Sequence, residues 1–124
     1  MVKAKRVYDP PENGDGLRVL TMRLWPRGIA KSRVDLWLKE LGADVANIRA
    51  WKAGTLDWPE MRARYLAGLE RPAAAAALAE LQSLAVRGTV TILCSCADEA
   101  RCHRGILKSL LGAGARRQGA RAAR

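Results

Sequence analysis

The sequence predicts a layered α/β domain built on a small, mainly parallel sheet, and three observations support this fold class. Short apolar runs rich in β-branched residues alternate along the chain with longer segments of helical periodicity. Proline, glycine and helix-capping residues separate these segments. The chain has 124 residues, of which 49% are hydrophobic, so that it is long and apolar enough to bury one core of its own.

Three segments are predicted to be strands. Residues 5–9 form a short candidate that ends in a turn rich in proline and glycine. Residues 17–25 form a second candidate, whose central part is apolar on both faces, as in a covered sheet. Residues 89–94 are the clearest strand, because they are β-branched and apolar and follow Gly88. Since helices separate these strands, the sheet is expected to be mainly parallel.

Five segments have the apolar periodicity of helices. Capping side chains or proline mark their starts, and glycine or proline marks several of their ends. These segments are residues 32–42, residues 44–53, residues 57–69, the alanine-rich residues 73–86, and a last helix that begins near Asp98 and buries Ile106, Leu107, Leu110 and Leu111.

The predicted domain spans residues 1–112, and residues 113–124 are expected to be a basic, disordered tail because they lack periodicity. No apolar stretch approaches the ~20 residues that cross a bilayer, and the first six residues lack the apolar core of a signal peptide. The odd number of clustered cysteines does not indicate a disulfide framework. We therefore expect a cytoplasmic protein with reduced thiols and no membrane partner.

The charge of the chain favours anionic partners. The formal net charge is +10, and without the four tail arginines 18 basic and 12 acidic residues remain, which leaves +6 on the body. Such a charge attracts a small anionic ligand or a nucleic acid. The alternative interpretation is that the charge serves solubility alone.

The segment most indicative of chemistry holds all three cysteines and the only histidine within ten residues: Cys94, Cys96, Cys102 and His103. It follows the clearest strand and leads into the last helix, an order that places a site at the carboxyl end of a sheet. The amino terminus of a helix lowers the pKa of a nearby thiol and attracts anions. The segment is therefore a candidate site for both nucleophilic chemistry and anion binding.

Three interpretations of this segment remain open. In the first, Cys94 or Cys96 is a reactive thiolate assisted by His103, with Cys94 as the leading candidate, and Cys102 is a further catalytic candidate. In the second, the thiols and the imidazole are buried side chains without chemistry. In the third, the three cysteines and the histidine bind zinc. The spacing disfavours zinc, because adjacent residues of a helix point ~100° apart. We therefore expect no metal and no cofactor. The spacing from cysteine to arginine also excludes a phosphatase-type loop.

A second basic segment follows the second predicted strand. Arg23 and Arg27 flank Trp25, and arginine forks suit carboxylates and phosphates while an indole offers a stacking face. The alternative is a solvated basic loop. If this segment and the cysteine segment share one edge of the sheet, an anion site gains support. Its candidate residues are Arg23, Trp25, Arg27, Arg104, Tyr8 and Asp9.

Four motifs carry a resemblance to a known family. They are Arg6-Val7-Tyr8-Asp9-Pro10-Pro11, then Asp15-Gly16 followed after one residue by Arg18-Val19-Leu20, then Arg23-Leu24-Trp25-Pro26-Arg27-Gly28, and finally Asp35-Leu36-Trp37-Leu38-Lys39-Glu40. Over roughly residues 3–111, the chain resembles the DUF488 family of uncharacterised bacterial proteins, in its YeaO-like branch. The resemblance implies a compact, Rossmann-like three-layer α/β domain and no established activity.

The resemblance also implies a candidate active site at the recurrent cysteines and an aspartate of the family. Cys94, Cys102, His103, Arg23 and Arg27 fit its pattern. Relatives usually carry aspartate just before the arginine of the second strand, where this chain has Met22. Many relatives also carry a histidine after the motif matched by Arg49-Ala50-Trp51, whereas Lys52-Ala53-Gly54 follows here.

Together these observations lead to one expectation and two alternatives. We expect a small-anion or nucleotide-binding site at the sheet edge, with a cysteine-dependent activity. The alternatives are a basic nucleic-acid-binding module without catalysis and a structural zinc-binding domain.

Overall fold

A computed structural model describes the backbone of residues 1–122 and the side chains of residues 1–112. Four strands form one sheet in the order β1-β4-β2-β3, and every neighbouring pair is parallel. The strands are β1 (Val2–Arg6), β2 (Leu17–Leu20), β3 (Leu36–Trp37) and β4 (Val90–Cys94). The small parallel sheet of the predicted fold class is thus confirmed.

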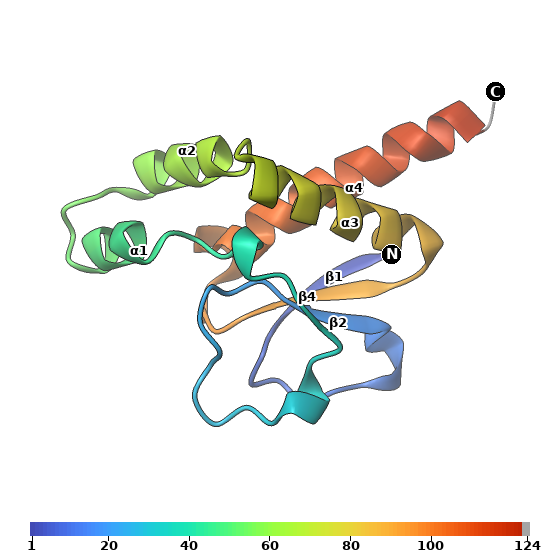
Figure 1. The fold of residues 1–124 in the computed structure, drawn as a ribbon, viewed down its shortest axis with the longest axis horizontal. Coiled ribbons are helices and arrows are strands. Elements are labelled where there is room, and N and C mark those ends of the chain that lie inside the picture. Colours follow the sequence, from blue (N-terminus) through green and yellow to red (C-terminus); the bar gives the residue numbers. More distant parts are fainter. Residues whose placement is uncertain (123–124) are drawn as a thin grey trace.

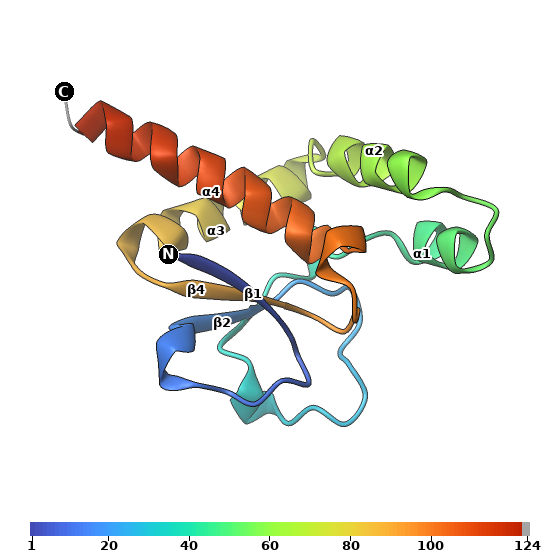
Figure 2. The same cartoon turned by 180° about the vertical axis from the view of Figure 1, so that it is seen from behind.

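Four α-helices accompany the sheet in the described residues: α1 (Val45–Lys52), α2 (Trp58–Gly68), α3 (Pro72–Arg87) and α4 (His103–Ala122). In Figures 1 and 2, α3 and α4 lie along one side of the sheet, and the long loops after β1 and β2 lie on the other side. These loops form the third layer. The pair α1 and α2 extends beyond the carboxyl ends of the strands.

Side chains along β4 alternate between the two faces of the sheet, and this alternation decides on which face Cys94 lies. Val90 and Ile92 belong to the main core with the helices, whereas Leu93 belongs to a second cluster with residues of the loop layer. Because successive side chains of a strand point to opposite faces, Cys94 shares the face of Ile92. The last residue of β4 therefore presents its thiol on the helix side, toward the start of α4.

Several predicted elements are confirmed, with shifted ends. Asp44 and Asp57 accept hydrogen bonds from the first turns of α1 and α2, as their capping role requires. The first two strands end earlier than predicted. After β1, the carboxylate of Asp9 binds the backbone N–H of Arg6 in a turn. The chain also leaves the sheet soon after Leu20, which ends β2.

The predicted helix over residues 32–42 is wrong. The segment instead forms a 3₁₀ turn (Lys31–Arg33), the short strand β3 and a second 3₁₀ turn (Lys39–Leu41). Leu38 donates its backbone N–H to the carbonyl of Leu20, so the segment continues the sheet beside β2. Pairing with an open sheet edge overrides the helical spacing of the apolar residues.

The last helix begins later than predicted. Asp98 caps a 3₁₀ turn (Glu99–Arg101), and α4 starts only at His103. Between them Cys102 is extended, with φ −143° and ψ 148°. Cys102 and His103 are therefore not neighbours on one regular helix, so the ~100° divergence expected of such neighbours does not apply to them.

The separate basic tail and the cytoplasmic location both remain predictions. The backbone of α4 continues to Ala122, but the side chains from residue 113 on lie outside the described residues, so the division into domain and tail stays a prediction. Among residues 1–122, no helix has both the length and the apolar character of a membrane span.

Candidate functional site

A cleft of about 310 Å³ opens at the carboxyl ends of β2 and β4. Three parts of the chain form its walls: the segment after β2, the helices α1 and α2, and the loop between β4 and α4. Cys94, Cys96, Cys102 and His103 all line it. The cysteine segment thus faces a solvent-reachable space on the helix side of the sheet.

The three sulfurs lie close together at this cleft. The Sγ of Cys94 is 3.4 Å from that of Cys102 and 3.6 Å from that of Cys96. Cys94 and Cys102 are buried, and Cys96 is half-buried. Cys94 is held in the sheet, since its carbonyl accepts the backbone N–H of Val7. The other two sulfurs come from the loop and converge on this fixed one.

The backbone directly after β2 orients His103 toward the thiols. Its Nε2 donates to the carbonyl of Thr21, because a carbonyl can only accept. Nδ1 therefore carries a free lone pair, 3.9 Å from the sulfur of Cys94 and 3.8 Å from that of Cys102. Burial lowers the pKa of His103, so the imidazole is neutral at neutral pH and can accept a proton.

The surroundings of Cys94 favour its thiolate. The pKa of Cys94 lies below its ordinary value because the thiols of Cys102 and Cys96 donate to its sulfur, and the nearby Arg104 guanidinium adds a positive charge. The pKa of Cys102 lies above its ordinary value because its proton is engaged by Cys94. Among these three thiols, the negative charge belongs to Cys94.

Arg104 lies behind the cysteine loop. It is buried, and its Nη1 donates to the carbonyls of Cys96, at 2.6 Å, and Cys94, at 3.4 Å. Its Nε has no hydrogen-bond partner among the described residues. Arg104 therefore ties the loop to α4 and places a positive charge beneath the thiols, and it is not among the residues that line the cleft.

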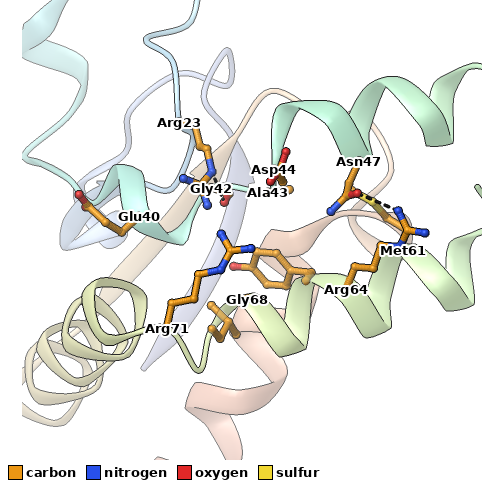
Figure 3. A pocket seen from close by; sticks show the side chains of 12 residues that line it. Arg23, Glu40, Gly42, Ala43, Asp44, Asn47, Met61, Arg64, Gly68 and Arg71 are labelled. Carbon is orange, nitrogen blue, oxygen red and sulfur yellow. Dashed lines mark hydrogen bonds between the residues drawn. The ribbon is translucent and has the colours of Figure 1, made fainter.

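Four cations line the cleft: Arg23, Arg49, Lys52 and Arg101. No carboxylate stands among the described residues of the lining. Arg23 is anchored by its Nε, which donates to the carbonyl of Gly42 at 3.1 Å (Figure 3). The same arginine also borders a smaller hollow of about 30 Å³, drawn in Figure 3. The charge distribution of the cleft therefore suits an anion.

An apolar wall completes the cleft. Trp51 of α1 and Trp58 of α2 both line it, with ring centroids 5.6 Å apart and planes inclined by 59°. Met22, Leu24 and Ile48 add further apolar surface. Aromatic and aliphatic side chains beside a few charged groups are typical of small-molecule sites.

The structure brings only part of the predicted site together. Cys94, Cys102, His103 and Arg23 line one cleft, with Arg104 behind it. The remaining predicted anion-binding residues lie in the loop layer, outside the cleft lining: Tyr8, Asp9, Trp25 and Arg27.

Specific contacts hold these four residues in the loop layer. The hydroxyl of Tyr8 donates to the carbonyl of Arg27, and the carboxylate of Asp9 accepts the backbone N–H of Arg6. The indole of Trp25 donates to the carbonyl of Ile29 and packs edge-on against another indole. The side chains of Tyr8, Asp9 and Trp25 therefore brace the loops on the side of the sheet away from α4.

Sequence reasoning missed the contribution of α1 and α2. Arg49, Trp51, Lys52 and Trp58 line the cleft although none had been singled out as a site residue. One signal could have found them, since Arg49-Ala50-Trp51 already formed part of the resemblance to the family. Met22 and Lys52, where the chain departs from the family pattern, also line the cleft.

The same thiols meet one requirement of a metal site. The sulfurs of Cys94, Cys96 and Cys102 all lie within 4.8 Å of one another, so a single soft cation could contact all three. Nδ1 of His103 lies beside two of these sulfurs. Thiol chemistry and metal binding are thus two uses of one cluster, and the metal content of the protein distinguishes them.

Comparison with known proteins identifies the family to which the chain is similar. The family model DUF488-N3a, described as "Active DUF488-N3 subclade", matches residues 2–114. The chain is 37% identical over 113 residues to the uncharacterised proteins Rv3073c of Mycobacterium tuberculosis and Mb3100c of Mycobacterium bovis, which covers 89% of this chain and 92% of each relative.

A further relative is the uncharacterised protein YeaO of Escherichia coli, with 43% identity over 70 residues. That match covers 55% of this chain and 61% of YeaO. No solved structure matches the chain. The family model covers nearly the whole chain and the mycobacterial relatives match along most of their length, so the chain belongs to the DUF488 family.

Proposed function

We propose that the cleft binds a small anionic ligand, with a nucleotide as its best-fitting class, and that Cys94 acts on this ligand as a nucleophile. One observation carries the proposal. The sulfur of Cys94 sits beside a neutral imidazole in a cleft where, among the described residues, Arg23, Arg49, Lys52 and Arg101 line the walls and no carboxylate does. A nucleophile, a proton acceptor and an electrophile-binding surface are the components that thiol catalysis requires.

The four cations support an anionic ligand. They approach the cleft from three directions: Arg23 from the segment after β2, Arg49 and Lys52 from α1, and Arg101 from the cysteine loop. Guanidinium groups bind phosphate or carboxylate oxygens in pairs, and these charge-assisted hydrogen bonds are stronger than neutral ones. Without a carboxylate in the described lining, an anion meets no opposing charge there.

The aromatic wall favours a nucleotide over a bare phosphate. A volume of about 310 Å³ lies within the range of small-molecule pockets and exceeds what an isolated phosphate fills. Trp51 and Trp58 supply ring faces on which a base can stack, while the cations bind its phosphate. The proposed substrate class is thus an anion with an attached planar ring.

The thiol cluster supports nucleophilic attack. Nδ1 of His103 lies beside the Cys94 thiolate with a free lone pair, so it can accept a proton at the reacting centre. The thiols of Cys102 and Cys96 stabilise that thiolate by hydrogen bonds. The thiolate then attacks an electrophilic centre of the bound ligand. The bond between the sulfur and that centre forms, the bond from the centre to its leaving group breaks, and the leaving group departs with the bonding electron pair and takes up a proton from solvent. Arg104, which holds the carbonyls of the loop, is a positioning residue in this scheme.

Protection of Cys94 against alkylation tests the proposal. Iodoacetamide should modify Cys94 faster than a free thiol at neutral pH, and adenosine monophosphate should slow this modification. Inorganic phosphate should protect only at higher concentration, because it lacks the ring. The modified residue is identified by peptide mass analysis, on protein whose metal content has first been measured.

Two arginine variants sharpen this experiment. Arg49→Ala removes a cleft cation and should raise the half-protecting concentration of adenosine monophosphate by about tenfold, since a charge-assisted hydrogen bond contributes about 1.5 kcal/mol or more. Arg62→Ala is the matched control, because Arg62 is exposed on α2 and lines neither hollow. The proposal is contradicted if adenosine monophosphate protects Cys94 equally well in Arg49→Ala and Arg62→Ala. It is also contradicted if iodoacetamide modifies Cys94 no faster than a free thiol.

A further inference from the structure

We propose that Cys94 and Cys102 form a reversible disulfide, with Cys94 as the sulfur that a hydroperoxide oxidises first and Cys102 as the thiol that resolves it. The cleft would then be an oxidation site as well as a ligand site. This inference rests on the proposed function in one respect, the reactivity of Cys94, and needs no bound anion.

The two sulfurs are already in contact. Their separation of 3.4 Å is shorter than the 3.6 Å between Cys94 and Cys96, and bond formation requires an approach of about 1.4 Å to the usual S–S length. Cys94 is fixed by the parallel pairing of β4 with β1. Cys102 is the extended residue between a 3₁₀ turn and α4, so a small rotation there can close the gap.

Cys94 is the sulfur on which oxidation should begin. It receives a hydrogen bond from the thiol of Cys102, lies 3.6 Å from the sulfur of Cys96, and has the Arg104 guanidinium behind its carbonyl. A thiolate, not a thiol, attacks a peroxide, and oxidation follows thiolate character and access. Because Cys94 lines the open cleft, a small uncharged hydroperoxide can reach it.

The chemistry balances without a bound cofactor. The thiolate of Cys94 attacks one peroxide oxygen, the O–O bond breaks, and the leaving alkoxide or hydroxide takes up a proton from solvent. The resulting sulfenic acid is attacked by the sulfur of Cys102. The S–O bond breaks, the S–S bond forms, and the departing hydroxide leaves as water.

The imidazole has a defined place in the second step. Nδ1 of His103 is 3.8 Å from the sulfur of Cys102, so it can take the proton of that thiol and pass it to the departing hydroxide. In sum, two thiols lose two electrons and one hydroperoxide is reduced to an alcohol, or to water, plus water. An external dithiol reductant reverses the change by exchange.

The disulfide has a structural consequence for the cleft. It would join the end of β4 to the start of α4 and close the nine-residue loop from Cys94 to Cys102, whose carbonyls Arg104 already holds. The nucleophile would be masked but recoverable. It would also be protected from irreversible oxidation to the sulfinic acid.

Intact mass and peptide mapping test the pairing in metal-free full-length protein. One equivalent of hydrogen peroxide should remove two hydrogens from the wild-type mass, and mapping should link the peptides of Cys94 and Cys102. In Cys102→Ser the same treatment should add one oxygen at Cys94, and excess peroxide should add a second. Cys96→Ser is the matched control and should still form the disulfide.

Other outcomes overturn the inference. The first is a disulfide that still forms in Cys102→Ser, and the second is the same oxidation product from wild type and Cys102→Ser. The third is purified protein that contains stoichiometric zinc, with all three thiols unreactive until a chelator removes the metal. The mapping on wild type decides the pairing even if a variant fails to fold. A rapidly alkylated, anion-protected Cys94 without a disulfide refutes this inference alone. A disulfide without anion protection refutes only the anion-binding part of the proposed function.

Discussion

Cys94 combines two properties that seldom coincide in a buried cysteine. It is almost completely excluded from solvent, with 2% of its surface exposed, yet it lines an open cleft. An isolated buried thiol resists ionisation because burial disfavours the charged form. Here the neighbouring thiols of Cys102 and Cys96 donate to the sulfur, and their effect exceeds that of burial, so the pKa of Cys94 is lowered.

The rate of alkylation of Cys94 should therefore depend weakly on pH near neutrality. A lowered pKa means that the thiolate persists as the pH falls, so the midpoint of the pH–rate profile should lie below the ordinary thiol value of about 8.5. Iodoacetamide kinetics between about pH 5 and pH 9 measure this. The titratable and charged groups that face the sulfur are Cys96, Cys102, His103, Arg104 and the more distant Tyr65.

One variant separates the thiol donors from the other groups. Cys102→Ala removes the strongest donor to Cys94, so the midpoint should move to higher pH by about one pH unit. A profile that is unchanged in Cys102→Ala means that Cys102 does not stabilise the thiolate. A wild-type midpoint at or above the ordinary thiol value contradicts the arrangement of charges described for the cluster.

At the scale of secondary-structure elements, the second 3₁₀ turn (Lys39–Leu41) positions the cation Arg23. Gly42 follows this turn with ordinary backbone angles, and its carbonyl accepts the Nε of Arg23. A Cβ at Gly42 would overlap the backbone nitrogen of Arg23 and its Cγ. Only glycine therefore allows the turn to approach the segment after β2 this closely.

Gly42→Ala should both destabilise the protein and weaken the site. The overlap with the backbone of Arg23 should cost about 1–3 kcal/mol of unfolding free energy, as for other overpacked positions, and should displace the guanidinium from the cleft. Urea unfolding measures the first effect. The concentration of adenosine monophosphate that protects Cys94 measures the second and should rise.

Gly68→Ala is the matched control for this substitution. Gly68 ends α2, and a Cβ there meets no atom within 4 Å. Alanine should be neutral or stabilising by up to about 1 kcal/mol, because it has the higher helix propensity. If Gly42→Ala and Gly68→Ala have the same unfolding free energy and need the same concentration of adenosine monophosphate to protect Cys94, the close approach at Gly42 does not determine the position of Arg23.

At the scale of the whole molecule, the net charge of +10 raises the question of nucleic-acid binding. The cations of the chain extend well beyond the four in the cleft. A protein that binds a polyanion through many exposed cations loses affinity steeply with salt, because counterions are released. A ligand bound by a few cations in a cleft loses far less.

Salt dependence should therefore separate the two kinds of binding. Short single-stranded RNA should bind at low ionic strength and weaken by about 10³-fold or more between about 50 and 200 mM salt if six or more phosphates are contacted. Protection of Cys94 by adenosine monophosphate should weaken much less over the same range. Fluorescence anisotropy and alkylation kinetics measure the two.

A cleft variant completes this comparison. Arg49→Ala removes one charge of many and should leave RNA affinity nearly unchanged while it impairs protection by the nucleotide. RNA binding that is insensitive to salt argues against an electrostatic surface. If Arg49→Ala instead abolishes RNA binding, the cleft itself is the nucleic-acid site.

The elements that were predicted well are those whose signals are local. The strand β4 is apolar on both faces, and α1 and α2 begin after aspartates that cap them. The helix predicted over residues 32–42 was wrong because its apolar spacing is also satisfied by a strand pairing with β2, and only the open sheet edge decides between the two. Helical spacing cannot report a partner that is distant in the sequence.

The candidate site likewise has one part that local sequence signals predict and another part that they do not. The sequence by itself determined that Cys94 ends a strand, that His103 follows in the next helical segment, and that Arg23 lies near the end of another predicted strand. It left open whether these segments share one edge of the sheet. Only the tertiary structure decided that α1 supplies Arg49 and Lys52 to the cleft. It also decided that Cys102 lies before the helix, in contact with Cys94, and that Trp25 and Arg27 remain in the loop layer. The physical reason is that residue patterns encode local conformation and burial, whereas the packing of a helix or loop against the end of the sheet depends on contacts between distant segments.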